Sequence, residues 1–164
     1  MIFKIIPGGA FVENTYILQS ENSNEIILVD PGSQTLEIEE ALSDLKFNKI
    51  HIWNTHGHLD HAYGVDYFKK KYSADFNIHE KEIPILEAMK TAASRFGIPE
   101  FSDAIVPEID SFIEDEKEYT VGNLNFKTIL VPGHSPGSIC FHFTKTLNPN
   151  EKLVEDILIC GDTV

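Results

Sequence analysis

Four side chains that can bind a metal ion occur within six residues of this 164-residue chain, and this run constrains the fold more than any other feature. The run reads His56-Gly57-His58-Leu59-Asp60-His61 and directly follows a β-type segment at residues 50–53. Sites on α/β scaffolds usually form in loops at strand ends, so the fold is expected to place this loop beside a cavity. A lone loop histidine is usually a surface residue, whereas four ligand types in six positions favour a metal site.

The spacing within the run suits two neighbouring ions. His56 and His58 are two residues apart, so in extended backbone their side chains point the same way and can bind one ion. Asp60 and His61 follow after a turn and can reach a second ion beside the first. Gly57 has no Cβ and lets the backbone approach closely. Histidine and carboxylate ligands together suit zinc, with iron and manganese as alternatives.

Two later residues are further candidate ligands. His134 lies in a loop, residues 131–138, whose paired prolines and glycines fix a rigid turn after a predicted strand. Asp162 follows another predicted strand and Gly161, and its two carboxylate oxygens can bridge two ions. Each residue alone is weak evidence, because a single histidine in a loop is more often a surface residue and aspartate is common in turns. Together with the first run they predict one shared site.

The remaining histidines and the two cysteines are assigned structural roles. His51 and His142 lie within strand-like segments, which favours packing or surface roles, and His79 is placed to cap a helix or lie near the pocket. Cys140 and Cys160 have neither zinc-finger nor redox-motif spacing, so we predict two buried free thiols. Such sparse cysteine usage fits a reducing compartment.

Strand-like and helix-like segments alternate along the chain. We predict strands at residues 2–6, 15–19, 26–29, 50–53, 76–78, 118–121, 124–131, 139–143 and 156–160. We predict helices at residues 36–45, with Leu36 on the apolar face, at 62–72, and at 83–96 with Gly97 as C-cap. A loop at 98–111, a hairpin turn at Gly122-Asn123 and a polar connection at 147–155 complete the chain. This mixed order indicates an α/β or α+β layered domain covering residues 1–164.

The charge balance narrows the class of partner. The chain has 13 Lys and Arg against 26 Asp and Glu, a formal net charge of −13. Such a surface repels phosphate backbones and anionic membranes, so we predict a small-molecule substrate, no nucleic acid and no membrane. The N-terminal segment is too short and too soon broken by Pro7 for a signal peptide, which predicts a cytoplasmic protein.

Four segments, in this order, resemble motifs of the metallo-β-lactamase superfamily. The turn Asp30-Pro31-Gly32 is similar to the structural turn before that family's first helix, and residues 55–61 read as its signature T-H-x-H-x-D-H. Residues 132–138 resemble its second histidine motif, and Gly161-Asp162-Thr163 its bridging-aspartate motif. The resemblance covers nearly the whole chain and implies an αββα sandwich with the site at one edge, between two sheets.

The resemblance also implies roles for six side chains. The first metal would be held by His56, His58 and His134, the second by Asp60 and His61, and Asp162 would bridge both. A metal-bound hydroxide would then attack an acyl carbonyl, with Asp60 as a catalytic residue that orients the hydroxide or carries its proton.

Among the branches of that family, this chain looks most like the glyoxalase II-like small hydrolases, which implies thioester hydrolysis of the hydroxyacylglutathione type. A lactonase or lactamase activity, or a non-catalytic metal-binding module, stays open. The family supplies a further histidine beyond the bridging aspartate, whereas this sequence ends at Val164. The resemblance therefore predicts an incomplete second half of the sandwich. An unpaired sheet edge and an uncovered core face would then allow a homodimer.

Overall fold

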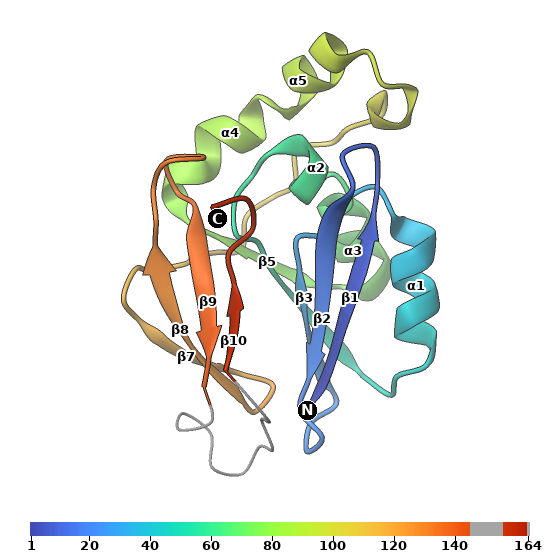
Figure 1. Ribbon diagram of the computed structural model, residues 1–164. Coiled ribbons are helices and arrows are strands. Elements are labelled where there is room, and N and C mark those ends of the chain that lie inside the picture. Colours follow the sequence, from blue (N-terminus) through green and yellow to red (C-terminus); the bar gives the residue numbers. More distant parts are fainter. Residues whose placement is uncertain (145–155, 164) are drawn as a thin grey trace.

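Two β-sheets pack face to face in the computed structural model, which describes residues 1–144 and 156–163 (Figure 1). The first sheet has the strand order β1-β2-β3-β4-β5-β6. Its strands are β1 (Ile2–Gly8), β2 (Glu13–Gln19), β3 (Glu25–Val29), β4 (Lys49–Trp53), β5 (Asp75–Ile78) and β6 (Ser111–Phe112). β1, β2 and β3 pair antiparallel, and from β3 to β6 each neighbouring pair is parallel.

The second sheet is antiparallel throughout and has the order β10-β9-β8-β7. It contains β7 (Glu118–Val121), β8 (Leu124–Leu130), β9 (Ile139–Phe143) and β10 (Ile157–Ile159). The predicted hairpin between β7 and β8 is confirmed, because Gly122 and Asn123 both have positive φ, 53° and 64°. Tight two-residue hairpins require this backbone conformation at both central positions.

Both faces of the first sheet are buried, and the side chains of β3 show how. Ile26 and Leu28 belong to the core beneath the helices, while Ile27 and Val29 belong to the core between the two sheets. A near-continuous apolar run is typical of such a doubly covered strand. In the second core Trp53 packs edge-to-face on Phe126, with ring centroids 5.0 Å apart.

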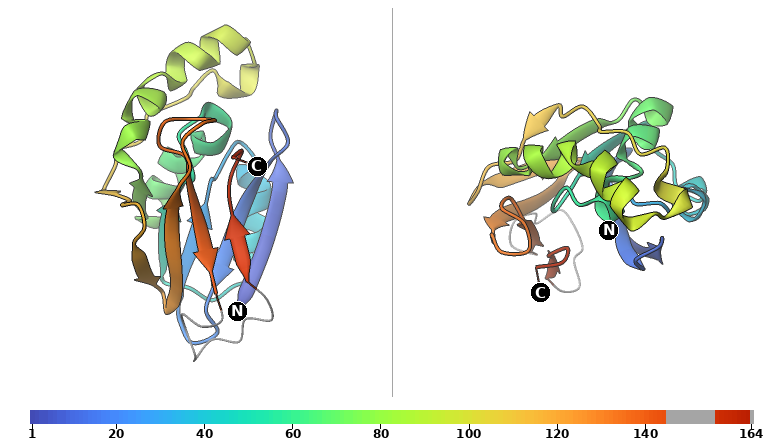
Figure 2. Two further views of the ribbon diagram at one scale, coloured as in Figure 1. Left: turned by 60° about the vertical axis from the view of Figure 1, so that its left-hand side comes forward. Right: turned by 90° about the horizontal axis from the view of Figure 1, so that it is seen from above.

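The helices cover the outer face of the first sheet and one end of the molecule (Figures 1 and 2). α1 (Thr35–Ser43) and α3 (Val65–Tyr72) contribute to the helix-side core. α2 (Leu59–Ala62), η1 (Glu80–Glu82), α4 (Ile83–Glu87), α5 (Met89–Phe96) and η2 (Pro99–Phe101) follow the ends of β4 and β5. The predicted layered sandwich of two sheets with helices is confirmed, and within the described residues no helix covers the outer face of the second sheet.

Several predicted boundaries are wrong in detail. The helix predicted at 83–96 is interrupted at Ala88, although it ends at Gly97 with left-handed φ of 60°, as predicted. The helix predicted at 62–72 is two helices, α2 and α3. The loop predicted at 98–111 contains η2 and the start of β6. The polar connection predicted at 147–155 lies outside the described residues.

Two burial predictions also need correction. Leu36 is 77% exposed, because α1 turns Ile38 and Leu42 toward the core and Leu36 away from it. Cys140 is a buried free thiol as predicted, whereas Cys160 is only half-buried. Burial and the neighbouring Cys160 raise the pKa of the Cys140 thiol, which disfavours its thiolate form.

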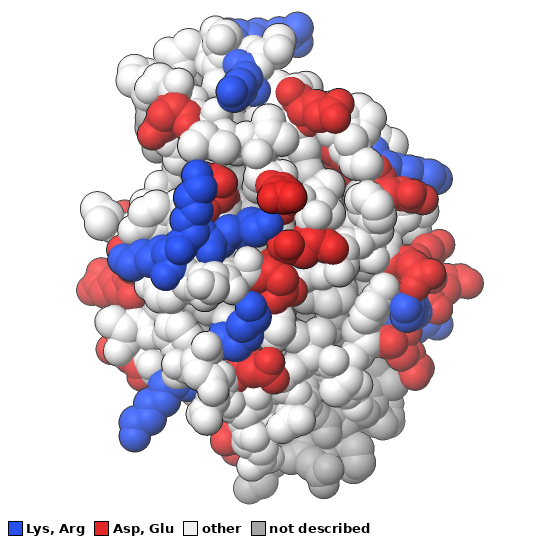
Figure 3. All heavy atoms as spheres, turned by 180° about the vertical axis from the view of Figure 1, so that it is seen from behind, with Lys and Arg blue, Asp and Glu red and all other residues white. Residues whose placement is uncertain are grey.

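Charged side chains are interspersed on the surface. On the face seen from behind, Lys and Arg side chains, some of them next to one another, lie among Asp and Glu side chains (Figure 3). None of the described helices has the length and apolar character needed to cross a bilayer. The pairing of two chains stays a prediction.

Candidate metal centre

The ends of β3, β4, β8 and β10 meet at one edge of the sandwich, next to α2 (Figure 1). Because β3 and β4 are parallel, the loops after them begin side by side. The loop after β4 carries His56 and His58 and leads into α2, which carries Asp60 and His61. The second sheet adds the β8–β9 loop and the segment that follows β10. Segments about a hundred residues apart in sequence thus converge on one site.

Three histidines form the first group of possible ligands. The ring centroids of His56, His58 and His134 lie 4.6 to 4.9 Å apart in each pair. His58 Nδ1 lies 2.9 Å from His134 Nε2. One nitrogen from each ring lies within 4.8 Å of the others, close enough to bind a single ion. Burial first, and then the neighbouring His134, lower the pKa of His58, so its imidazole favours the neutral form that binds metals.

Two carboxylates and a histidine form the second group. His61 Nε2 lies 3.5 Å from Asp60 Oδ2 and 3.2 Å from Asp162 Oδ2. The same Asp162 oxygen lies 3.3 Å from His134 Nε2 and 3.9 Å from His56 Nε2. Asp162 therefore stands between the two groups, where one carboxylate can contact two neighbouring ions.

His56 offers a free lone pair within this cluster. The Thr55 hydroxyl lies 2.6 Å from Asp30 Oδ2 and donates its hydrogen to that carboxylate, so it accepts from His56 Nδ1 at 3.0 Å. The proton of the imidazole is then on Nδ1, and Nε2 is unprotonated. Nε2 is buried and has no hydrogen-bond partner. Burial, together with the three neighbouring histidines, lowers the pKa of His56 to about 2. A buried acceptor without a donor fits a metal ligand.

The donor set therefore suits two metal ions. The second group is strongly anionic, because His61 faces carboxylates on both sides. Burial opposes a charge on His61, but its hydrogen bond with Asp30 at 3.0 Å and the charges of Asp30, Asp60 and Asp162 raise its pKa to about 10. The surroundings thus favour a positive charge at this point, and a metal ion supplies one in place of the proton.

A model of the metallo-beta-lactamase superfamily matches residues 8–147 of this sequence. The chain belongs to the metallo-beta-lactamase superfamily. It is 32% identical over 143 residues to "Hydroxyacylglutathione hydrolase GloC" of Haemophilus influenzae, covering 86% of this chain and 66% of that protein. It is 25% identical over 164 residues to "Probable metallo-hydrolase YqgX" of Bacillus subtilis, covering 100% of this chain and 72% of that protein.

Solved structures of this superfamily share the fold. The crystal structure of the B3 metallo-beta-lactamase BLEG-1 superposes with a TM-score of 0.75 at 29% identity, over 88% of this chain and 68% of that one. This chain thus spans roughly two thirds of the length of these superfamily members.

The structure also shows site residues that the sequence patterns did not reveal. The sequence resemblance predicts Asp30 only as part of a structural turn, yet its carboxylate accepts from Thr55 N, Thr55 Oγ1 and His61 Nδ1. Its position at the end of a buried strand beside β4 was a usable signal. Glu13, at the start of β2, is buried 3.9 Å from His61 Nδ1, and burial raises its pKa to about 8. No local pattern around Glu13 distinguishes it from an exposed strand residue.

The three remaining histidines take structural roles among the described residues. His51 binds Asp75 and Glu25. His79 caps η1, because its Nδ1 accepts from Lys81 N at 3.1 Å. His142 lies in β9, with Nε2 3.7 Å from Asp156 Oδ2.

A cleft of about 270 Å³ opens beside the cluster of candidate metal ligands. Four of its lining residues are candidate ligands and four are apolar: His58, Asp60, His134 and Asp162, and Phe11, Leu59, Ala92 and Phe96. Phe11 packs edge-on against Phe96 with ring centroids 5.2 Å apart, and both rings are about half exposed. The cleft thus combines a polar end with an apolar wall, as small-molecule sites do.

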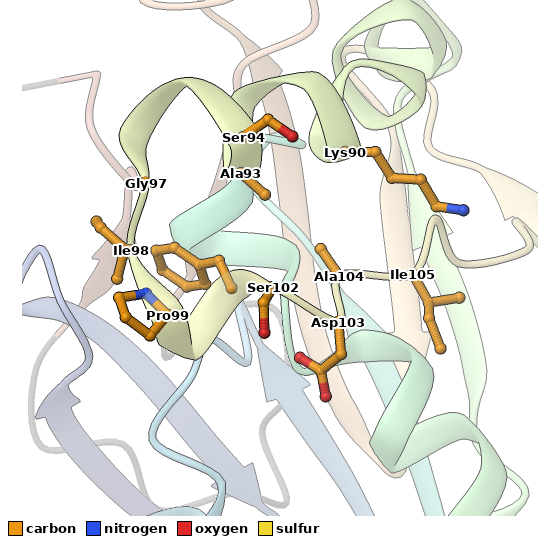
Figure 4. A pocket seen from close by; sticks show the side chains of 11 residues that line it. Lys90, Ala93, Ser94, Gly97, Ile98, Pro99, Ser102, Asp103, Ala104 and Ile105 are labelled. Carbon is orange, nitrogen blue, oxygen red and sulfur yellow. The ribbon is translucent and has the colours of Figure 1, made fainter.

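A larger cavity, about 720 Å³, lies between α5 and the segment after it (Figure 4). None of the cluster residues lines it. Its only titratable lining groups are Lys90 and Asp103, and the Asp103 carboxylate accepts a hydrogen bond from Tyr63. In the close-up the Lys90 side chain extends away from Asp103. Without convergent polar groups this cavity does not suit catalysis, so the smaller cleft is the candidate active site.

Proposed function

We propose that this chain carries the active site of a metal-dependent hydrolase that cleaves a small acyl substrate, a thioester of the hydroxyacylglutathione type. One observation supports this above all others. Six side chains that can bind metal come from three distant segments, and the buried Nε2 of His56 is directed at them without a partner. The metal-ligand roles are part of this proposal.

We assign the ligands as two groups joined by one carboxylate. His56, His58 and His134 would hold one ion, Asp60 and His61 a second, and Asp162 would contact both. Histidine and carboxylate ligands favour zinc, with iron and manganese as alternatives. A divalent ion bound here would supply a water of pKa near 7 and polarise the acyl carbonyl.

The side chains of the cleft would perform the remaining steps. The Asp60 carboxylate lines the cleft and is partly exposed, so a water molecule beside the substrate could reach it. It would orient the attacking water and accept its proton. Leu59, Ala92, Phe11 and Phe96 would contact the acyl group and exclude bulk water. The small volume of the cleft favours a short acyl group.

The thioester assignment comes from the relative named hydroxyacylglutathione hydrolase, at 32% identity. A specific observation also favours a second candidate, since the matched structure of a B3 metallo-beta-lactamase has 29% identity and a TM-score of 0.75. Lactam or lactone hydrolysis is therefore the alternative activity. A metal-binding module without catalysis is the third, because the chain spans only part of its relatives' length.

Elemental analysis of the purified chain, combined with one substrate panel, tests the proposal. The panel contains a hydroxyacylglutathione thioester, a simple lactone and a β-lactam. We expect bound zinc, iron or manganese and cleavage of the thioester. Cleavage of only the lactone or the lactam would support the alternative. Bound metal without turnover would support the binding module, and a chain that binds none of the three metals would overturn the proposal.

A further inference from the structure

Glu82, the last residue of η1, is a buried carboxylate that neither the sequence motifs nor the proposed ligand set includes. It is fully buried, with 0% exposure. Hydrogen bonds within η1 hold this turn in place. Glu82 N donates to His79 O at 3.0 Å, and the His79 ring caps the same turn. Glutamate is rarely buried completely unless its oxygens are hydrogen-bonded. Its partners therefore indicate its role.

All three donors to Glu82 come from the two loops that carry the candidate histidines. Oε1 accepts from Gly57 N at 2.8 Å and from the Ser135 hydroxyl at 2.9 Å. Oε2 accepts from Gly137 N at 2.8 Å. Gly57 lies between His56 and His58 in sequence, and Ser135 directly follows His134. One carboxylate thus contacts both ligand-bearing loops.

The backbone of both loops is adapted to this contact. A Cβ at Gly137 would lie 2.9 Å from Glu82 Cγ and 3.1 Å from its Oε2. A Cβ at Gly57 would lie 3.0 Å from Leu86 Cγ, in the helix that follows Glu82. Glycine therefore allows both amides to reach the carboxylate.

The two loops belong to different sheets. The loop with Gly57 follows β4 of the first sheet, and the loop with Ser135 joins β8 to β9 of the second. Glu82 follows β5 and lies 25 and 53 residues away from these two partners. Across the sandwich at this point, His58 Nδ1 and His134 Nε2 are 2.9 Å apart. Hydrogen bonds to a carboxylate are stronger than neutral ones, which suits a link between two sheets.

We propose that Glu82 is a positioning residue that holds the two histidine loops in register, so that His58 and His134 face one ion. The inference rests on the metal site of the proposed function. Glu82 contacts neither substrate nor metal in this role and acts only through Gly57, Ser135 and Gly137. Residues that orient metal ligands typically contribute a factor of about 10 to 100 in metal affinity.

The test compares Glu82→Gln with Thr128→Val, a matched loss of buried hydrogen bonds away from the site. Glutamine keeps one acceptor oxygen but presents an amide donor to an N–H that needs an acceptor. Thr128 is fully buried in β8, and its hydroxyl bonds Glu114 O and Lys117 N. Zinc affinity is measured by competition with a chromophoric chelator, and stability of the metal-free chains by urea unfolding. We expect zinc affinity to fall about 10- to 100-fold in E82Q and less than twofold in T128V.

Amide hydrogen exchange of the metal-free chains gives a second readout that needs no metal. We expect faster exchange at Gly57 and at residues 131–138, which include Gly137, in E82Q but not in T128V. E82Q with wild-type zinc affinity, and a stability loss like that of T128V, would overturn the inference. If the wild-type chain itself binds no zinc, iron or manganese, the proposed function fails. Exchange then decides the role of Glu82 alone, and unchanged rates in E82Q would overturn it.

Discussion

Strand β4 has His51 at its centre, and the loop that follows the strand begins the candidate metal-binding run with His56. The surroundings of the two histidines are opposite. His51 Nδ1 lies 2.6 Å from Asp75 Oδ1, and its Nε2 lies 2.9 Å from Glu25 Oε1. His56 has a hydroxyl at Nδ1 and no partner at Nε2. The hydrogen bond to Asp75 chiefly raises the pKa of His51, while burial chiefly lowers that of His56.

This difference shows what separates a structural histidine from a candidate ligand. With a carboxylate at hydrogen-bond distance from each ring nitrogen, His51 has both nitrogens occupied and leaves neither open to a metal. The Thr55 hydroxyl fixes one tautomer of His56 and leaves the other nitrogen unprotonated inside a cluster of ligand groups. Residue type is the same at both positions, so the partners of the two ring nitrogens account for the difference.

The largest expected effect is on zinc binding, where the two histidines should differ completely. His56→Ala removes the proposed ligand nitrogen and should weaken zinc binding by more than about a hundredfold, beyond the loss typical of residues that only orient ligands. His51→Ala, in the strand that precedes the His56 loop, is the matched control and should keep the wild-type affinity. Isothermal titration with zinc measures both. Equal affinities in the two variants would show that the comparison is wrong.

The next effect concerns two aspartates. Asp30 contacts Thr55 and His61 in the candidate metal-binding run, and Asp75 contacts His51. Asp30→Asn keeps the side-chain shape and tolerates the positive φ of 53° at this position, but it removes the charge that Thr55 and His61 contact. We expect a 10- to 100-fold loss of zinc affinity, because the orientation of His61 is no longer fixed. Asp75→Asn makes the same change beside His51 and should leave zinc binding intact. A larger zinc defect in the Asp75 variant than in the Asp30 variant would contradict this assignment.

A smaller effect, on stability, tests the charge of His51. Because its pKa is raised on folding, its contribution is fully present below the unfolded value of 6.5 and is lost as pH rises through the folded pKa. His51→Gln should therefore cost about 1 kcal/mol at pH 6 and progressively less at higher pH. Urea unfolding across pH 6 to 9 measures the difference between the two chains. A difference that does not change with pH would show that His51 folds as a neutral side chain.

The smallest expected effect concerns the cleft beside the His56 cluster. Phe96→Ala removes a half-exposed ring that packs on Phe11, a pairing worth about 0.5 to 1.5 kcal/mol. If the proposed function holds, the ring would contact the substrate equally in the ground state and the transition state, so we expect KM for an acyl thioester to rise about threefold with kcat unchanged. Phe112→Ala, a similarly exposed phenylalanine in β6 outside the cleft, is the control. A fall in kcat instead would assign Phe96 to the chemistry rather than to binding.

Much of the fold was predictable because it depends on local pattern. The alternation of apolar residues located most strands, and Gly122-Asn123 located a hairpin turn that needs two positive φ values. Predictions failed where tertiary contacts override local preference. β6 has only two residues and exists through its parallel pairing with β5. Leu36 fits a helical apolar face in sequence, yet it points to solvent, because α1 packs through Ile38 and Leu42.

The candidate site, too, was predictable only where local sequence patterns mark its residues. The run from His56 to His61, with His134 and Asp162, stood out through residue type and position after strands, and the structure brings these residues together. Glu82 and Glu13 had no comparable signal, since a single glutamate beside a strand is ordinarily exposed. Their partners are 25 to 55 residues away along the chain, and no periodicity encodes such a contact.

The sequence by itself determined which chemical groups are available and in which local structures they lie, because strand alternation, turn conformation and ligand type depend on near neighbours in the chain. Only the tertiary structure decided what each group can do. The arrangement of the strands brings the carboxylates to His51, brings Asp30 to the Thr55 hydroxyl beside His56, and brings together the loops joined by Glu82. Protonation, lone-pair direction and burial follow from those contacts, so two histidines five residues apart acquire different chemistry.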